Sequence, residues 1–174
     1  VALDSTPASP GVVFAASHGG HLGQAMRLRV ELKSQGTVVA TANSMPAYAA
    51  HEGFAVVPTL TSRTSWLRNL VASLALALRL RPRIVVSLGC RDVGFFCLFS
   101  KGLGAKLVLV ESFARVRTPS SFVRVLAPLA DRILVQWPEL TTALRSATVT
   151  RPVYALRPPI ARQIRNVFVV VGTF

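Results

Sequence analysis

The stretch "GVVFAASHGGHLGQ", residues 11–24, joins a short apolar run to a segment with helical spacing. The run is apolar throughout, as is typical of a strand that is buried on both faces of a parallel sheet. After the glycine pair, apolar side chains recur at the spacing of one helix face: Leu22, Ala25, Leu28 and Leu32. Gly36 is expected to end this helix. The stretch therefore predicts a strand that turns at two glycines and continues into a helix.

The same alternation continues along the chain. Five further apolar runs are expected to be strands: residues 37–43, 54–60, 83–89, 105–112 and 132–138. Three further helices are expected over residues 64–81, 92–101 and 120–130. Thr64 or Ser65 is expected to cap the first of these, and Pro82 to end it. Strands and helices that alternate in this way predict an α/β fold with a doubly wound, mostly parallel, Rossmann-like sheet.

Composition limits the classes of protein that fit this pattern. The 174 residues are 51% hydrophobic, which suits one domain with its own core. The formal net charge of +13 favours anionic partners, whether nucleic acid, an acidic membrane surface or a phosphorylated substrate. No apolar run reaches the about 20 residues of a transmembrane helix, and residues 1–10 lack the features of a signal peptide. Cys90 and Cys97 lack metal-ligand spacing, so we expect reduced core thiols.

Changes in residue composition and hydrophobic pattern divide the chain into four parts. Residues 1–10 are expected to be a flexible lead-in, and residues 11–150 one Rossmann-like domain. Residues 151–166 are rich in proline and arginine and are typical of a linker. Residues 167–174, "VFVVVGTF", have the pattern of a buried strand, which is either the last strand of the first sheet or the first strand of a second domain.

The loop "SHGGH" follows the first strand and so lies at the carboxyl edge of the predicted sheet, where open α/β sheets bind ligands. Gly19 and Gly20 allow a ligand to approach the main chain, and the N–H groups of the following helix suit a phosphate. The loop matches neither G-x-G-x-x-G nor G-x-x-x-x-G-K-[ST], and His18 and His21 have no further metal ligand beside them. A plain strand-to-helix turn would explain the glycines but not the histidines.

Two more polar clusters follow later strands and are expected at the same edge. "ESFARVRTPSS" spans residues 111–121 after the fifth predicted strand, and a shorter cluster ends the sixth. The polar and aromatic residues concerned are Glu111, Arg115, Arg117, Ser120, Gln136 and Trp137. Since parallel strands end at one edge, the sequence predicts a single site there.

The motifs "ASHGGHLGQ", "ESFARVRTPS" and "PLADRILVQWPEL", in this order, resemble a known family over about residues 11–145. The family is the acceptor-side subunit of two-part glycosyltransferases, comprising bacterial exopolysaccharide PssD-type proteins and the eukaryotic membrane-anchoring subunit of the dolichol-linked N-acetylglucosamine transferase. Its loop is usually A-S-S-G-G-H-L. Here His18 replaces the second serine, whereas Ser17, Gly19, Gly20 and His21 match.

The resemblance implies the N-terminal half of a GT-B enzyme, located peripherally at the cytoplasmic face of the cell membrane. Such an enzyme moves a sugar from a nucleotide sugar, in this family UDP-linked, to an acceptor carried on a lipid diphosphate. No cofactor and no metal are expected. A donor-binding half, separate or fused, would hold the nucleotide sugar. The tail "NVFVVVGTF" is similar to the opening strand of that half, with Phe174 where the family has a histidine.

The resemblance also implies roles for individual residues. The acceptor diphosphate would be held by Ser17, His18, Gly19, Gly20, Glu111, Arg115 and Ser120. His21 matches the last position of the related MurG-type loop "GGTGGH"; it would either take the proton of the acceptor hydroxyl or hold the diphosphate. Judged by its place at a strand end, Glu111 would either orient a histidine or an arginine or be structural, and His51 is expected to be a surface residue. Gln136 and Trp137 would contact the donor-binding half.

The predicted helix over residues 64–81 is apolar around most of its circumference. Such a helix is either core or a helix that dips into a membrane surface. In the second case Trp66, Arg68, Arg79 and Arg81 would contact an anionic membrane.

Three other classes of protein agree with part of the sequence. A basic nucleic-acid-binding module agrees with the charge, but the arginines are scattered and no recognition motif is present, so no nucleic acid is expected. A nucleotide-binding Rossmann enzyme acting alone lacks its glycine motif. A non-catalytic membrane scaffold that recruits a glycosyltransferase subunit remains an alternative.

Overall fold

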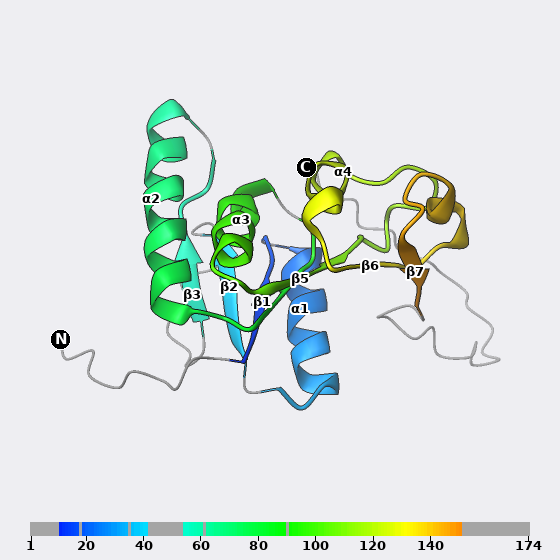
Figure 1. Cartoon of the computed structure of the whole chain (residues 1–174), viewed down its shortest axis with the longest axis horizontal. Coiled ribbons are helices and arrows are strands. Elements are labelled where there is room, and N and C mark those ends of the chain that lie inside the picture. The colour runs from blue at the N-terminus through cyan, green and yellow to red at the C-terminus, as the bar shows by residue number, and fades with distance from the viewer. Residues whose placement is uncertain are drawn as a thin grey trace, which may run out of the picture.

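The structure is a computed structural model that describes residues 11–17, 19–34, 36–41, 54–60, 62–89 and 91–150. In these ranges seven strands form one parallel sheet in the order β3-β2-β1-β4-β5-β6-β7 (Figure 1). The strands are β1 Val12–Ala15, β2 Thr37–Thr41, β3 Phe54–Val57, β4 Ile84–Ser87, β5 Lys106–Val110, β6 Arg132–Val135 and β7 Ala147–Val149. The predicted doubly wound α/β fold is confirmed.

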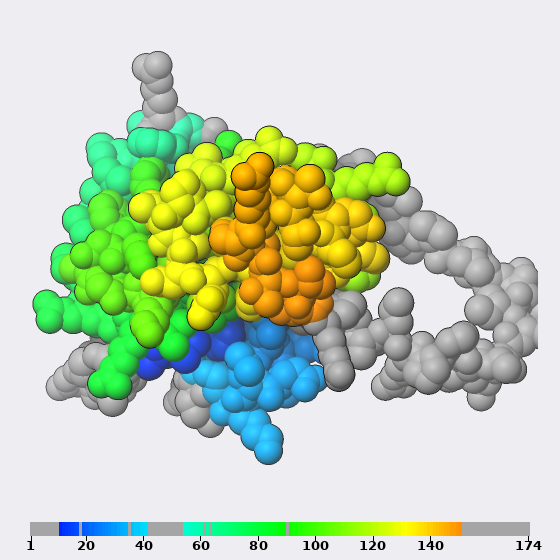
Figure 2. Space-filling view, turned by 45° about the vertical axis from the view of Figure 1, so that its right-hand side comes forward, coloured from blue at the N-terminus to red at the C-terminus, as the bar shows by residue number. Residues whose placement is uncertain are grey.

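Helices cover both faces of the sheet. They are α1 Gly20–Glu31, α2 Arg63–Leu80, α3 Gly94–Gly102 and α4 Ser121–Leu126, with short 3-10 turns η2 Arg91–Val93, η3 Ala127–Leu129 and η4 Pro138–Thr142. Leu22 and Ala25 of α1 pack with Phe14 on one face. The larger core lies on the other face, where α2, α3 and α4 pack. Figure 2 shows α4 and the segments that follow it, in yellow to orange, covering one side of the molecule above α1.

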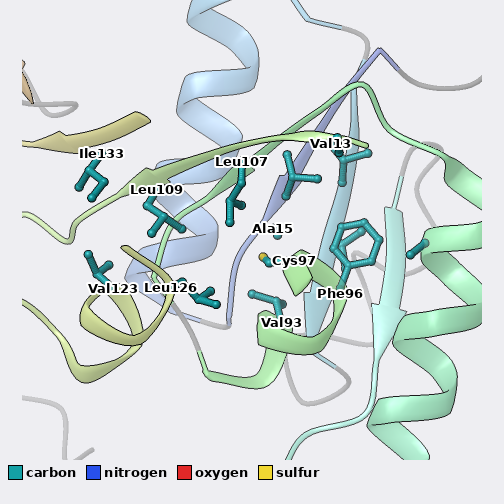
Figure 3. Close-up of a cluster of buried hydrophobic side chains, with 14 of the residues drawn as sticks. Val13, Ala15, Val93, Phe96, Cys97, Leu107, Leu109, Val123, Leu126 and Ile133 are labelled. Atoms are coloured by element: carbon teal, nitrogen blue, oxygen red, sulfur yellow. The ribbon is translucent and has the colours of Figure 1, made fainter. Parts of the chain in front are cut away.

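Figure 3 shows how the larger core is filled. Phe96 and Cys97 of α3 lie beside Ala15 of β1, and all three side chains are buried (Figure 3). α4 closes the neighbouring part of the same core with Val123 and Leu126 (Figure 3). Cys97 is therefore the buried core thiol that the sequence predicts.

The register of the central strands determines which residues meet at the carboxyl edge. Ala15 of β1 pairs with Ser87 of β4, and Ser87 pairs with Leu109 of β5. The chain leaves β1 for β2 on one side and later returns to β4 on the other, so the switch point of this topology lies between β1 and β4. Residues that follow these strand ends are brought together where α/β sheets bind ligands.

The first helix differs from its prediction at its C-terminal end. α1 ends at Glu31, and Leu32 is 62% exposed, so its predicted place in the core is wrong. Lys33 takes a left-handed conformation with φ 47° just after the helix. Gly36 does not cap the helix, because it lies well beyond it. It is needed because a Cβ at Gly36 would overlap the carbonyl oxygen of Val12.

α2 begins one residue earlier than predicted, and Ser62 is its N-cap. The Ser62 hydroxyl accepts a hydrogen bond from the N–H of Ser65 at 3.2 Å, and the Ser65 hydroxyl is 2.7 Å from the Ser62 nitrogen. This reciprocal pair is a capping box. The helix ends at Leu80, with Arg81 in a left-handed conformation before Pro82, as predicted.

β7 is the strand that the sequence analysis missed. It adds a seventh strand at the edge, beside β6. The predicted lead-in at 1–10, linker at 151–166 and strand at 167–174 lie outside the described residues, as do His18, His51 and Cys90.

Candidate functional site

A cavity of about 650 Å³ opens at the carboxyl edge of the sheet, beside the switch point. We call it the polar cavity. It is lined by Ser17, Gly19, Gly20, His21, Gly89, Glu111, Ser112, Ala114, Arg115 and Ser120. The described residues that the sequence predicts for acceptor binding, from two motifs about 90 residues apart, thus line one cavity.

The start of α1 forms one wall of the polar cavity. Gly19 is the N-cap, with φ 71° and ψ −137°, a conformation that side-chain-bearing residues rarely adopt. The helix has no side-chain cap and no acidic residue in its first turn. The first N–H groups of a helix have no partner within it, and the helix dipole adds a partial positive charge there. This wall therefore suits an anion such as a phosphate.

His21 lies on the first turn of α1, half-buried, with its ring at the wall of the polar cavity. Its Nδ1 is shielded from solvent. The sequence left two roles open for this imidazole, proton acceptor and diphosphate ligand. Its position on the first turn of α1, at the polar cavity, is compatible with either role.

Glu111 follows β5 and is fully buried. Its carboxylate accepts hydrogen bonds from the N–H of Ser112 at 2.8 Å and from the N–H and the hydroxyl of Ser120 at 2.7 and 3.0 Å. Within the described part of the chain, Ser112 and Ser120 are its only partners, so it orients neither His21 nor Arg115 there. Glu111 instead joins the two ends of the loop at residues 112–120.

Gln136 and Trp137 support this loop from the end of β6. Gln136 is buried, and its side-chain amide donates to the Glu111 carbonyl at 3.1 Å. The indole N–H of Trp137 donates to the Phe113 carbonyl at 2.7 Å, and the two rings lie 5.1 Å apart. Both polar groups are thus used within the chain, and their contact with a donor-binding half stays a prediction.

Arg115 and Arg117 lie on the exposed part of the supported loop. The N–H of Arg115 donates to the Ser112 carbonyl at 3.0 Å, which closes a turn. The ion pairs found among the described residues are Arg27–Glu31 and Lys101–Asp131, so neither loop arginine is neutralised by a described carboxylate. Arg115 brings a positive charge to the rim of the polar cavity.

Gly89 is a residue of the site that sequence reasoning missed. It follows β4 with φ 73°, and it faces the polar cavity between the glycine loop and Glu111. A Cβ there would lie 3.9 Å from a Glu111 carboxylate oxygen. The signal was present, because the run at residues 83–89 ends in this glycine at the predicted carboxyl edge.

α2 has two apolar faces, one buried in the core and one exposed, so the core interpretation holds for the first face and membrane contact by the second stays a prediction. Ala77 and Leu80 are buried against the sheet, whereas Leu67 is 63% exposed. The exposed face also carries Val71, Leu74 and Leu78. Trp66, Arg68, Arg79 and Arg81 are exposed as well. None of the helices in the described ranges combines the length and hydrophobicity of a membrane span.

No group of three or more potential metal ligands occurs among the residues that the structure describes. The polar cavity offers helix N–H groups, hydroxyls, an imidazole and an arginine. This set of donors suits an anionic oxygen ligand.

Comparison with known proteins shows that the chain matches a protein family. Residues 56–152 match the family described as "Oligosaccharide biosynthesis protein Alg14 like". The match includes Glu111, Arg115 and Ser120 and begins after the glycine loop.

Two curated relatives are similar over shorter stretches. The UDP-N-acetylglucosamine transferase subunit alg14 of Schizosaccharomyces pombe is 42% identical over 71 residues, which cover 38% of this chain and 34% of that protein. The subunit ALG14 of Cryptococcus neoformans is 53% identical over 34 residues, which cover 20% and 15%. The chain thus matches about a third of the length of the first relative and about a seventh of the second.

The fold is also similar to a solved structure. MurG of Acinetobacter baumannii superposes with a TM-score of 0.63 at 18% identity, covering 88% of this chain and 48% of that one. At this identity the likeness establishes the fold alone.

Proposed function

The chain belongs to the family of Alg14-like oligosaccharide biosynthesis proteins, and from this membership we propose that it is the acceptor-binding part of a membrane-associated glycosyltransferase. The family match confirms the resemblance drawn from the motifs. The proposed donor is UDP-N-acetylglucosamine, which the names of the relatives contain. The proposed acceptor is a sugar carried on a lipid diphosphate.

The observation that carries this proposal is the composition of the polar cavity. It joins an uncapped helix start, an imidazole and a positively charged loop at the switch point of the sheet. The acceptor diphosphate would lie against the N–H groups of Gly20 and His21, with Arg115 adding a charged contact. The Glu111 carboxylate also lines the cavity, but its oxygens accept hydrogen bonds from Ser112 and Ser120, so its place in the proposed site is to hold the loop that carries Arg115.

In the proposed reaction the acceptor hydroxyl attacks the anomeric carbon of the donor sugar. The bond from that carbon to the phosphate oxygen breaks, and UDP leaves. The hydroxyl loses its proton in this step, and His21 is the candidate base. If His21 instead holds the diphosphate, its loss would weaken acceptor binding more than the chemical step.

The donor site would come from a second half, because a GT-B enzyme binds its two substrates on two domains. Residues 11–150 would form the acceptor domain and residues 151–166 a linker. Residues 167–174 would begin a fused donor domain, with a separate subunit as the other arrangement. Gln136 and Trp137 remain candidates for the contact between the halves.

Membrane contact would come from α2. Its exposed apolar face, carried by Leu67, Val71, Leu74 and Leu78, would lie against the lipid, and Arg68, Arg79 and Arg81 would meet anionic head groups. Sedimentation with vesicles should therefore depend on anionic lipid and on salt. Leu74→Glu should weaken it, whereas Val30→Glu, on exposed α1, should not. If the amount of protein that sediments with vesicles does not change with lipid charge, salt or Leu74→Glu, the proposed membrane contact is contradicted.

The test of the function is transfer by the chain purified with its donor-binding half. We expect His21→Ala to lower transfer by roughly 100-fold or more, the usual contribution of a general acid–base group. The fold should be retained, because His21 is half-buried and lies on the first turn. A raised KM with normal kcat would identify a ligand role, and a lowered kcat with an altered pH profile a base role. Full activity of His21→Ala would contradict both.

A further inference from the structure

A second cavity, of about 290 Å³, lies between α2, α3 and α4. We call it the apolar groove. Its walls are formed mainly by Trp66 of α2, Phe95 and Leu98 of α3, and Phe122 and Val125 of α4. α2 and α3 lie side by side here (Figure 1), and the Trp66 and Phe95 rings meet edge to face at 4.7 Å.

The apolar groove is open to solvent although its walls are hydrophobic. Val125 is 73% exposed and Trp66 is 54% exposed. One end is fixed in place, because Arg91 donates to the Leu60 carbonyl at 3.2 Å and the Leu60 N–H reaches the Asp92 carboxylate at 3.4 Å. A preformed, solvent-open apolar groove of this kind is typical of a binding site for a ligand with an apolar part.

The apolar groove and the polar cavity are lined by residues that are neighbours in the chain. Ser120 lines the polar cavity and Ser121 lines the apolar groove, and consecutive Cα atoms are only about 3.8 Å apart. The same relation holds on the other side, where Gly89 lines the polar cavity and Arg91, two residues later, lines the apolar groove. This proximity suits one ligand that has a polar head in the polar cavity and an apolar tail in the apolar groove.

We propose that the apolar groove seats the hydrocarbon units nearest the diphosphate of the lipid-linked acceptor. This inference rests on the proposed function, and it adds a specific site for the lipid chain to it. A hydrocarbon chain fits better than an extended peptide, because an extended peptide would need partners for its N–H and C=O groups and these walls offer few. The groove also differs from the exposed face of α2, which would contact the membrane without recognising one chain.

Gly94 provides a way to fill the apolar groove without cutting into the core. It begins α3 and lines the groove, and a Cβ there would lie 3.4 Å from the Phe122 ring, an ordinary contact. Gly94→Leu should therefore occupy part of the groove. Gly102→Leu is the matched control, because Gly102 ends the same helix and has nothing within 4 Å of an added Cβ. Val125→Glu is a second variant at an exposed position, which places a charge at the rim.

The experiment measures transfer by the chain with its donor-binding half in a nonionic detergent. The two acceptors carry the same sugar diphosphate on either a phytanyl or a butyl chain. We expect the KM of the phytanyl acceptor to be lower by roughly tenfold or more, since each buried CH₂ adds to binding. Gly94→Leu and Val125→Glu should raise the phytanyl KM towards the butyl value and leave the butyl KM unchanged. Gly102→Leu should keep the wild-type ratio.

Equal KM values for the two acceptors in the wild type would contradict binding of the lipid chain in the apolar groove and leave the proposed function intact. A ratio that survives both Gly94→Leu and Val125→Glu would place the chain elsewhere and also overturn it. A concentration-dependent dimer that Gly94→Leu abolishes would make a second copy the occupant instead. Absence of transfer to both acceptors would overturn the proposed function and this inference together.

Discussion

Two helices begin beside the polar cavity, α1 and α4, and their first turns are built differently. At α4 the Ser120 hydroxyl accepts from the N–H of Val123 at 3.3 Å, and the buried carboxylate of Glu111 accepts from the N–H of Ser120. At α1 the cap is Gly19, which has no side chain, and no acidic residue lies in the first turn. The chain supplies its own cap and its own anion at one helix and neither at the other.

This difference indicates what each helix start does. A negative charge near a helix N-terminus is favourable, and the Glu111 carboxylate lies beside the start of α4, where it accepts from the N–H of Ser120. Its hydrogen bonds to Ser112 and Ser120 fix the loop that carries Arg115. At α1 the corresponding anion would be the diphosphate of the ligand. The start of α4 is thus expected to contribute to stability, and the start of α1 to ligand binding.

Glu111→Ala should have the largest effect on stability. It removes the acceptor for two N–H groups and a hydroxyl in a fully buried place. Hydrogen bonds to charged groups contribute more than neutral ones, so we expect the free energy of unfolding to fall by about 4 kcal/mol. Urea denaturation followed by circular dichroism measures this change.

Glu111→Gln is the control for shape. Its amide oxygen can still accept a hydrogen bond, but its NH₂ group then faces a donor, so we expect a loss of about 2 kcal/mol. If both variants unfold at the wild-type urea concentration, the carboxylate does not hold the loop, and the contrast between the two helix starts fails.

Gly19→Ala tests the other helix start. Its φ of 71° and ψ of −137° are strained for alanine, which should cost about 2 kcal/mol of folding free energy. Gly20→Ala is the matched control, because both sites have open space but Gly20 lies inside the helix. There alanine should stabilise by about 0.5 kcal/mol. Thermal unfolding of the two variants measures the difference, and equal melting temperatures would contradict the special conformation at Gly19.

Ser120→Ala should have a smaller effect. It removes the cap of α4 and one hydrogen bond to Glu111, and loss of a side-chain cap usually costs about 1 kcal/mol. Ser62→Ala removes the cap of α2 on the exposed surface and is expected to cost about 0.5 kcal/mol. Urea denaturation of both variants checks the order. A larger loss at Ser62 would show that the cap at the polar cavity has no special weight.

The sequence predicted the sheet because its buried strands are continuous apolar runs. β7 escaped because it is an exposed edge strand of three residues, Ala147–Val149, held by main-chain hydrogen bonds such as that from Thr150 to Val135. Main-chain hydrogen bonds can be made by nearly any residue, so an edge strand that depends on them cannot be recognised from its amino-acid composition. The two-faced character of α2 could not be read either, because a pattern that is apolar all round does not say which face meets the core.

The topology of the sheet explains why the location of the site could be predicted. Local geometry explains why some of its contacts could not be. Parallel strands end at one edge, so the glycine loop and the cluster at Glu111 had to be near each other. The partners of Glu111 could not be foreseen, because they depend on the loop returning to place Ser120 beside the carboxylate nine residues later. Gly89 could be placed at the carboxyl edge from the end of its apolar run, but its positive φ, on which its role depends, could not be inferred from the sequence.

Substitution of Asp131 is expected to have the smallest effect on stability. Comparing it with Glu111 tests whether burial makes the hydrogen bonds of Glu111 important. Asp131 too accepts from a main-chain N–H, that of Leu107 at 2.7 Å, and from Lys101 at 2.6 Å, but it is exposed. The hydrogen bond from Lys101, and then that from Leu107, lower the pKa of Asp131 below its ordinary 3.8. The contribution of this carboxylate is therefore complete above 3.8 and is lost as the pH falls through the lowered pKa. The wild type should melt slightly above Asp131→Asn near neutral pH, and the gap should close in acid. A gap that persists in acid would mean that the carboxylate acts by packing instead of by charge.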